Sequence, residues 1–111
     1  MLQILVVANN EEVLQKMLGI IATEEDWHAE GANDDERAIE LFHNHQHDLV
    51  ILSGIDPKVE TKLKAIVTRI YPQVNILLYA GGDDWFLKAQ INTIMGMNDE
   101  DLPVMDNPFR P

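Results

Sequence analysis

The sequence contains no cysteine. Disulfide bonds, thiol nucleophiles and cysteine-ligated zinc sites are therefore excluded together. A chain without disulfides is compatible with the reducing environment of the cytoplasm, and we expect a cytoplasmic protein.

Positive charge is scarce in this chain. There are 8 lysines and arginines against 19 aspartates and glutamates, which gives a formal net charge of −11. The resulting field repels the phosphate groups of nucleic acids and of anionic lipids. We therefore expect neither direct nucleic-acid binding nor membrane association.

Long apolar runs are missing as well. The apolar stretch that opens the chain is too short to cross a membrane, and no basic segment precedes it as in a signal peptide. Apolar residues nevertheless make up 46% of the 111 residues, which is enough for a hydrophobic core. We expect residues 1–111 to form a single domain.

What the sequence does have is a regular alternation of short apolar segments and amphipathic segments. The apolar segments are typical of buried strands, which we expect at residues 2–8, 49–52, 74–80 and 103–105. Apolar and polar residues loosely alternate at residues 27–32, where we expect a further strand. Apolar residues recur with helical spacing between them, and we expect helices within residues 11–25, 33–46, 57–72 and 83–97. The alternation predicts an α/β fold with a parallel, doubly wound sheet that is covered on both faces.

Four segments near the predicted strand ends carry a family pattern. "ILVVANN" is similar to ILVVDDN, "HDLVILSGIDP" to PDLVLLDxxMP, "YPQVNILLYA" to FPxxPVIxLTA, and "NPF" to KPF. Over essentially its whole length the chain resembles the receiver domain of bacterial two-component response regulators. The resemblance implies a CheY-like, flavodoxin-like fold of three α/β/α layers around a five-stranded sheet, and a role in phosphorelay signal transduction.

The residues that carry the chemistry of such receivers are replaced in this chain. In the alignment that the resemblance implies, Ala8 and Asn9 stand at the acidic Mg²⁺ ligands, and Ser53 stands at the phospho-acceptor aspartate. Tyr79 stands at the position of a hydroxyl residue on strand four, and Asn107 at the position of a lysine on strand five. All five residues are neutral. Mg²⁺ needs carboxylate oxygens, aspartyl phosphorylation needs the carboxylate itself, and a neutral amide cannot replace the charge of a lysine. We therefore expect a degenerate receiver, or pseudo-receiver, with no catalytic residue, metal or cofactor, which is no enzyme and works by protein–protein interaction.

Two alternatives remain open from the sequence. Phosphoryl transfer could use a noncanonical acceptor, either Asp56 in the loop after the third strand or Ser53 itself. The altered strand-end pocket could instead bind a small neutral polar ligand, because Asn9, Ser53, Tyr79 and Asn107 offer neutral hydrogen-bonding groups.

The histidine-rich run "HNHQH" places His43, His45 and His47 at alternate positions. Histidines four residues apart on a helix can share a metal ion. This run falls at a predicted helix end, however, and no carboxylate pattern completes it. We therefore interpret it as a polar helix terminus, where histidine complements the helix dipole.

The fourth predicted helix offers the best candidates for an interface. Trp85 and Phe86 open it, and we expect at least one of them in the core and an exposed one to contact a partner. Met95 and Met97 could form an adaptable apolar surface. The chain also ends at Pro111 without the final helix of a typical receiver, so we expect a homodimer or another protein partner on the face that this helix would cover.

Overall fold

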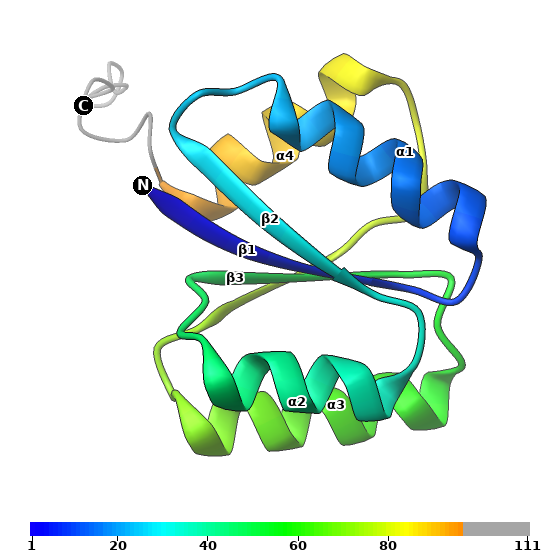
Figure 1. Cartoon of the computed structure of the whole chain (residues 1–111), viewed down its shortest axis with the longest axis vertical. Helices are drawn as coiled ribbons and strands as arrows, with labels where there is room; N and C mark the ends of the chain where they lie inside the picture. The colour runs from blue at the N-terminus through cyan, green and yellow to red at the C-terminus, as the bar shows by residue number, and fades with distance from the viewer. Residues whose placement is uncertain (97–111) are drawn as a thin grey trace, which may run out of the picture. The chain divides into compact units, whose positions relative to one another are not determined.

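The computed structural model describes residues 1–96, in which strands and helices alternate (Figure 1). The elements are β1 (Leu2–Ala8), α1 (Glu11–Ala22), β2 (Trp27–Ala32), α2 (Asp35–Asn44), β3 (Leu49–Ser53), α3 (Pro57–Ile70), β4 (Asn75–Leu78) and α4 (Asp84–Met95). The expected fifth strand at residues 103–105 lies outside the described residues, as do Met97 and Asn107. Residues 1–81 form one compact unit that contains the whole sheet, and α4 belongs to a second unit that begins at Gly82.

The sheet is parallel, with the strand order β2-β1-β3-β4. Its register pairs Leu5 of β1 with Glu30 of β2 on one side and with Val50 of β3 on the other. Every residue of β3 is buried, as is β1 from Ile4 onward. The predicted α/β fold with a parallel sheet is therefore confirmed for the four strands that the structure describes.

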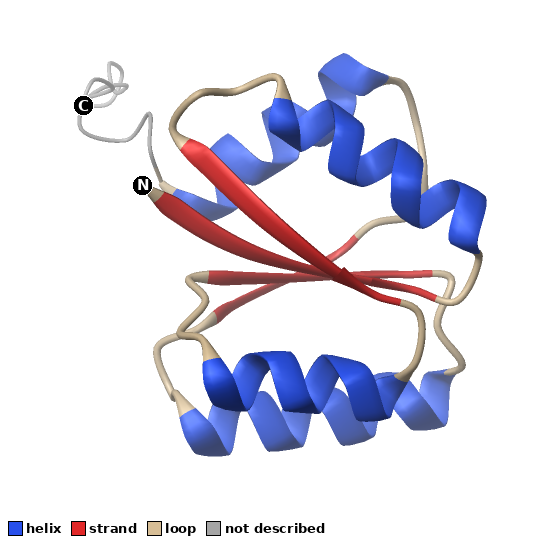
Figure 2. Ribbon diagram, viewed as in Figure 1, coloured by secondary structure: helices blue, strands red, loops and turns tan. Residues whose placement is uncertain are grey.

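Helices cover both faces of this sheet within residues 1–81. Figure 2 shows α1 on one face and the pair α2 and α3 on the other. The face under α2 and α3 holds a core that includes Leu5, Val50 and Phe42. On the opposite face α1 lies very close to β2, since a Cβ atom at Gly31 would be only 2.8 Å from Leu18 Cδ1.

Short polar side chains fix where the helices begin. Asn10, Asp34, Asp56 and Asp83 each accept a hydrogen bond from a backbone amide in the first turn of the following helix. Such caps satisfy amides that have no partner inside the helix. β4 is shorter than the expected 74–80, because its pairing with β3 covers only Asn75–Leu78.

Candidate functional site

The carboxyl end of the sheet brings together three of the positions that the sequence singled out. Ala8 at the end of β1 pairs with Ser53 at the end of β3. Tyr79 follows β4, and its backbone amide donates to the carbonyl oxygen of Leu52 at 2.9 Å. Ala8, Ser53 and Tyr79 are all buried, whereas Asn9 is exposed. The fifth position, Asn107, is not among the described residues.

An open hollow of about 380 Å³ lies at this end of the sheet. Ser53 and Tyr79 contribute to its lining, and so does Glu60 of α3. Asn9 does not line it, so the predicted pocket of neutral hydrogen-bonding groups is only partly assembled. Glu60 pairs with Lys64 at 3.4 Å, and its carboxylate still makes the hollow less favourable for a phosphoryl group than a neutral lining would.

The carboxylates nearest to this end in the sequence have other partners. Asp56 accepts from the backbone amide of Lys58 at 2.8 Å and caps α3. Glu11 accepts from the side-chain amides of Gln15 at 2.8 Å and Asn33 at 3.2 Å. Within residues 1–96, this end of the sheet has no group of three acidic or histidine ligand atoms close enough to share a metal ion.

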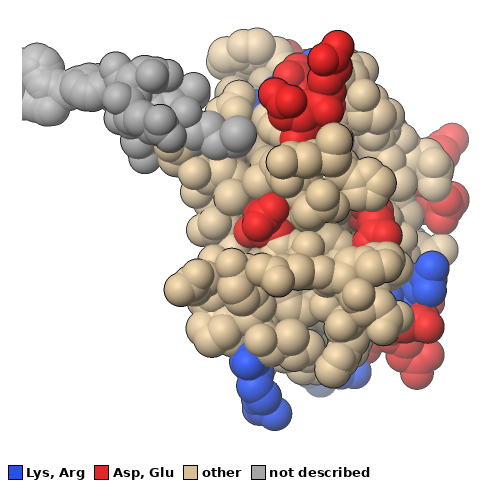
Figure 3. Space-filling model, turned by 60° about the vertical axis from the view of Figure 1, so that its left-hand side comes forward, with Lys and Arg blue, Asp and Glu red and all other residues tan. Residues whose placement is uncertain are grey.

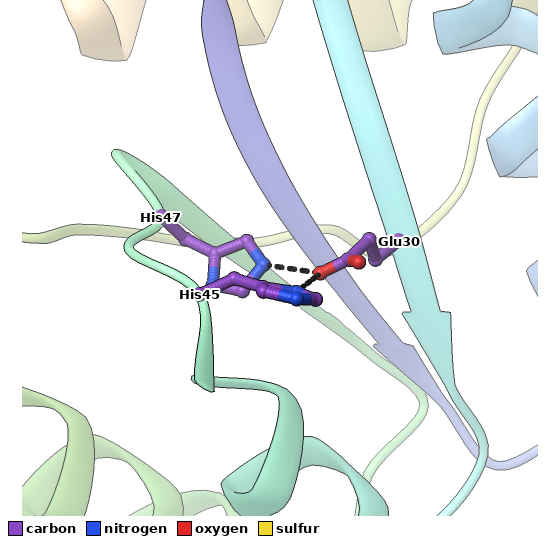
Figure 4. Close-up of side chains that lie close together, drawn as sticks. All are labelled: Glu30, His45 and His47. Carbon is purple, nitrogen blue, oxygen red and sulfur yellow. Dashed lines mark hydrogen bonds and ion pairs between the residues drawn. The ribbon is translucent and has the colours of Figure 1, made fainter. Parts of the chain in front are cut away.

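Such a group does occur towards the amino-terminal end of β3. It consists of Glu30, His45 and His47, whose ligand atoms all lie within 4.8 Å of one another. Figure 4 shows both imidazole rings directed at the Glu30 carboxylate. His45 Nδ1 and His47 Nε2 each lie 2.9 Å from the same oxygen, Oε1. We refer to these three residues as the His–Glu–His cluster.

Three separate elements position the cluster. Glu30 belongs to β2, and the register places it level with Leu5, on the face that α2 and α3 cover. His45 is the residue at which α2 ends, and His47 lies in the connection between α2 and β3. The turn from helix to strand therefore directs both histidines back over β1 towards β2.

The surroundings of the two histidines differ strongly. His47 is only 1% exposed, and its ring stacks on Phe42 with 5.7 Å between the ring centroids. The His45 side chain is 56% exposed. An ionised carboxylate only accepts hydrogen bonds, so each histidine donates an N–H to Glu30 in this arrangement. His47 Nδ1 is buried and has no hydrogen-bond partner among the described residues.

Glu30 responds to this environment. Burial alone raises the pKa of its carboxyl group, but the hydrogen bonds and charges of His45 and His47 together hold the pKa below the ordinary value of 4.5. Glu30 is therefore ionised at neutral pH.

The sequence did not predict this cluster, because the histidine run was interpreted as a polar helix terminus with no carboxylate to complete a metal site. His43 lies on the exposed side of α2, outside the cluster, so the pair four residues apart, His43 and His47, does not meet. His45 and His47 do meet, around the carboxylate of Glu30, which the sequence analysis missed. The available signal was a glutamate within the strand segment "WHAEGA", on the same face as the core residues of β1 and β3.

The aromatic residues of α4 behave differently from the prediction. Trp85 is 73% exposed and Phe86 is also exposed, so the expectation that at least one of them is a core residue is wrong. The buried positions of this helix are Leu87 and Ile91, which lie one turn apart on another side of the helix. Met95 is partly buried.

Acidic side chains appear at several places on the face shown in Figure 3, where basic side chains are few. In the part of the chain that the structure describes, no helix has the length and apolar character needed to span a membrane.

No protein-family model and no curated protein matches the sequence. Solved structures do match. The signal receiver domain of an HD domain-containing protein from Pseudomonas fluorescens Pf-5 has 19% identity and a TM-score of 0.75, with 89% of this chain and 98% of that chain covered. A CheY-like response regulator receiver domain protein from Methanospirillum hungatei JF-1 has 14% identity and a TM-score of 0.76, with 92% and 99% covered. A response regulator receiver domain protein from Clostridium thermocellum has 14% identity and a TM-score of 0.72, with 92% and 100% covered. The chain therefore has the CheY-like, flavodoxin-like fold of response regulator receiver domains.

Proposed function

We propose that this chain is a receiver-like module of two-component signal transduction that works by protein–protein interaction and without phosphorylation. The observation that carries the proposal is Ser53, which ends β3 beside Ala8 and Asn9, where a phospho-acceptor site would need carboxylates. The names of the structural neighbours support the signalling context.

The electrostatics of the strand-end hollow support the same proposal. Ser53 is neutral, and the acidic side chain that lines the hollow, Glu60, repels a phosphoryl group. The role of Asp56 also supports the proposal, because its carboxylate is engaged in capping α3. A Mg²⁺-dependent transfer of a phosphoryl group needs a metal held by oxygen ligands, usually carboxylates, and a positive charge beside the transferring group. Among the described side chains that line the hollow, Glu60 is the one carboxylate and none is positively charged.

The signalling output of the chain then depends on binding to a partner. We propose that the partner is a signalling protein or a second copy of this chain, and that binding takes place in the cytoplasm. Trp85 and Phe86 are adjacent exposed aromatic residues at the start of α4, and exposed aromatic residues often anchor interfaces. Met95, at the end of the same helix, adds adaptable apolar surface.

The decisive test is an amide NMR titration of the full chain with Mg²⁺ and then beryllofluoride, a mimic of the phosphoryl group. We expect no localised shifts at Ala8, Asn9, Ser53 or Tyr79. Saturable shifts confined to these residues would show a working phospho-acceptor site and would overturn the proposal. A phosphorylatable receiver domain serves as the positive control for the reagent.

Sedimentation velocity tests whether the partner is a second copy of this chain. We expect a concentration-dependent dimer that Trp85→Ala weakens, with Lys16→Ala as a matched control on the surface of α1. A chain that stays monomeric at high concentration would restrict the proposal to a different protein as partner.

Binding of a small neutral polar ligand is the second candidate function, and the open hollow beside Ser53 and Tyr79 is the observation that favours it. A ligand that binds the folded chain raises its melting temperature. A thermal-shift screen of neutral polar compounds, repeated on Ser53→Ala, would identify a ligand that depends on this hollow.

A further inference from the structure

We propose that Glu30, His45 and His47 form a binding site for a divalent transition-metal ion, with Zn²⁺ as the first candidate. The proposal concerns the His–Glu–His cluster and is independent of whether the strand-end hollow binds a phosphoryl group.

The donor set selects the kind of metal. Two imidazole nitrogens and one carboxylate oxygen are ligands that Zn²⁺ and similar transition metals bind well. Mg²⁺ and Ca²⁺ prefer sites made of oxygen ligands alone, so two imidazoles disfavour them. The absence of cysteine makes histidine and carboxylate the available strong ligands for zinc in this chain.

The geometry is close to that of a bound ion. Both ring nitrogens converge on one carboxylate oxygen, at 2.9 Å each (Figure 4). Donor atoms around a tetrahedral Zn²⁺ lie about 3.3 Å apart, given bond lengths near 2.0–2.1 Å. Each of the two N···O contacts therefore has to open by about 0.4 Å. Each ring also has to turn an unprotonated nitrogen to the ion, with its proton on the other ring nitrogen. The exposed His45 side chain can supply the movement at its own contact with Glu30.

The cluster is also preorganised. The ring of His47 is buried and held against Phe42, and the Glu30 side chain is only 23% exposed. Two of the three ligands are therefore fixed by the core before an ion binds, which lowers the entropic cost of binding. Glu30 carries a negative charge at neutral pH, and the chain as a whole has a net charge of −11. Both charges favour a cation.

The ring nitrogen of His47 that does not face Glu30, Nδ1, limits the expected affinity for the metal ion. A metal-bound histidine usually donates its other N–H to an acceptor, and loss of such a partner typically costs about 10–100-fold in affinity. His47 Nδ1 has no acceptor among the described residues. We therefore expect an affinity in the micromolar range, well short of the tightest structural zinc sites.

An open position for a further ligand is available. A hollow of about 370 Å³ borders the cluster and is lined by Gln3, His28, Glu30, His45 and Gln46. His28 lies two residues before Glu30 on β2, so the two side chains leave the strand on the same face. Water or His28 can complete the coordination sphere from this side.

The test is a Zn²⁺ titration of the full, metal-stripped chain. Binding is measured by calorimetry and, independently, by competition with a chromogenic chelator. We expect one ion per chain and at least tenfold weaker binding in Glu30→Gln and in His45→Ala. His43→Ala is the matched control, because it removes an exposed histidine of the same run outside the cluster, and its affinity should equal that of the parent chain.

NMR of the histidine rings gives a second readout that does not depend on any variant folding well. Zn²⁺ should shift the ring signals of His45 and His47 and leave those of His43 in place. The proposal is overturned if Zn²⁺ does not bind saturably, if His43→Ala weakens binding as much as Glu30→Gln does, or if the ring signals of His45 and His47 do not respond.

Discussion

The two ends of the sheet differ in the side chains that they bring together. At the carboxyl end, where parallel α/β sheets commonly bind ligands, β1 ends in Ala8, β3 ends in Ser53, and Tyr79 follows β4. Towards the amino end of β3, Glu30, His45 and His47 meet with hydrogen bonds of 2.9 Å. The fold therefore determines where a site can form, while the side chains determine whether chemistry is available there. In this chain the reactive groups lie at the end that the fold alone does not single out.

Replacing His47 by alanine should have the largest effect. The ring is almost fully buried, stacks on Phe42 and bonds to Glu30, so its removal leaves a cavity and takes away one of the two histidine hydrogen bonds of the Glu30 carboxylate. We expect a loss of about 2–4 kcal/mol in the free energy of unfolding. Urea denaturation measures it. Ser53→Ala is the matched change at the carboxyl end of the sheet. An equal loss of unfolding free energy in that variant would contradict the difference between the two ends.

Replacing Ser53 by aspartate tests the carboxyl end directly. The new carboxylate lies at a buried position without a metal ion or a positive charge beside it among the described residues, and we expect a destabilisation of about 1–3 kcal/mol. Beryllofluoride should still not bind, because Ala8 and Asn9 do not supply the metal ligands. Localised amide shifts in this variant upon addition of Mg²⁺ and beryllofluoride would contradict this expectation. They would show that the Ser53→Asp change alone is enough to restore a phospho-acceptor site.

Replacing Glu30 by glutamine should change how stability depends on pH. The pKa of Glu30 lies below its ordinary value in the folded chain, so the folded state binds this proton less tightly than the unfolded state does. The stabilisation is therefore complete above about pH 4.5 and is lost as the pH falls through the folded-state pKa. Urea denaturation between about pH 3 and 7 should show the parent losing its advantage over the variant in acid. A difference that stays constant with pH would contradict the role of Glu30.

Replacing His43 by alanine should have the smallest effect. This histidine is exposed and lies outside the His–Glu–His cluster. We expect a change in the free energy of unfolding within about 0.5 kcal/mol. A larger loss by urea denaturation would mean that the whole histidine run, rather than the cluster alone, stabilises this end of the sheet.

The sequence was a good guide to the elements and a weaker one to the site. The expected strands 2–8 and 27–32 coincide with β1 and β2, because a continuous apolar run and a loose alternation of apolar and polar residues are both local signals. The contact between Glu30 and the histidines depends on the register of β1 against β2 and β3. Glu30 is 15 positions from His45 and 17 positions from His47 in the sequence, so the contact leaves no local sequence pattern. Trp85 was misjudged for a related reason, since helical spacing does not reveal which side of a helix is buried.

The His–Glu–His cluster also has a consequence for how the chain opens. β2 and β3 both pair with β1, and α2 forms the crossover between them. Glu30 lies where the chain enters this crossover, and His45 and His47 lie where it leaves, so their hydrogen bonds close it into a loop. Local opening often occurs in cooperative units that coincide with supersecondary motifs such as this crossover. The amides of α2 should therefore exchange with solvent deuterium through a single concerted event, which an ion bound to the cluster would make rarer.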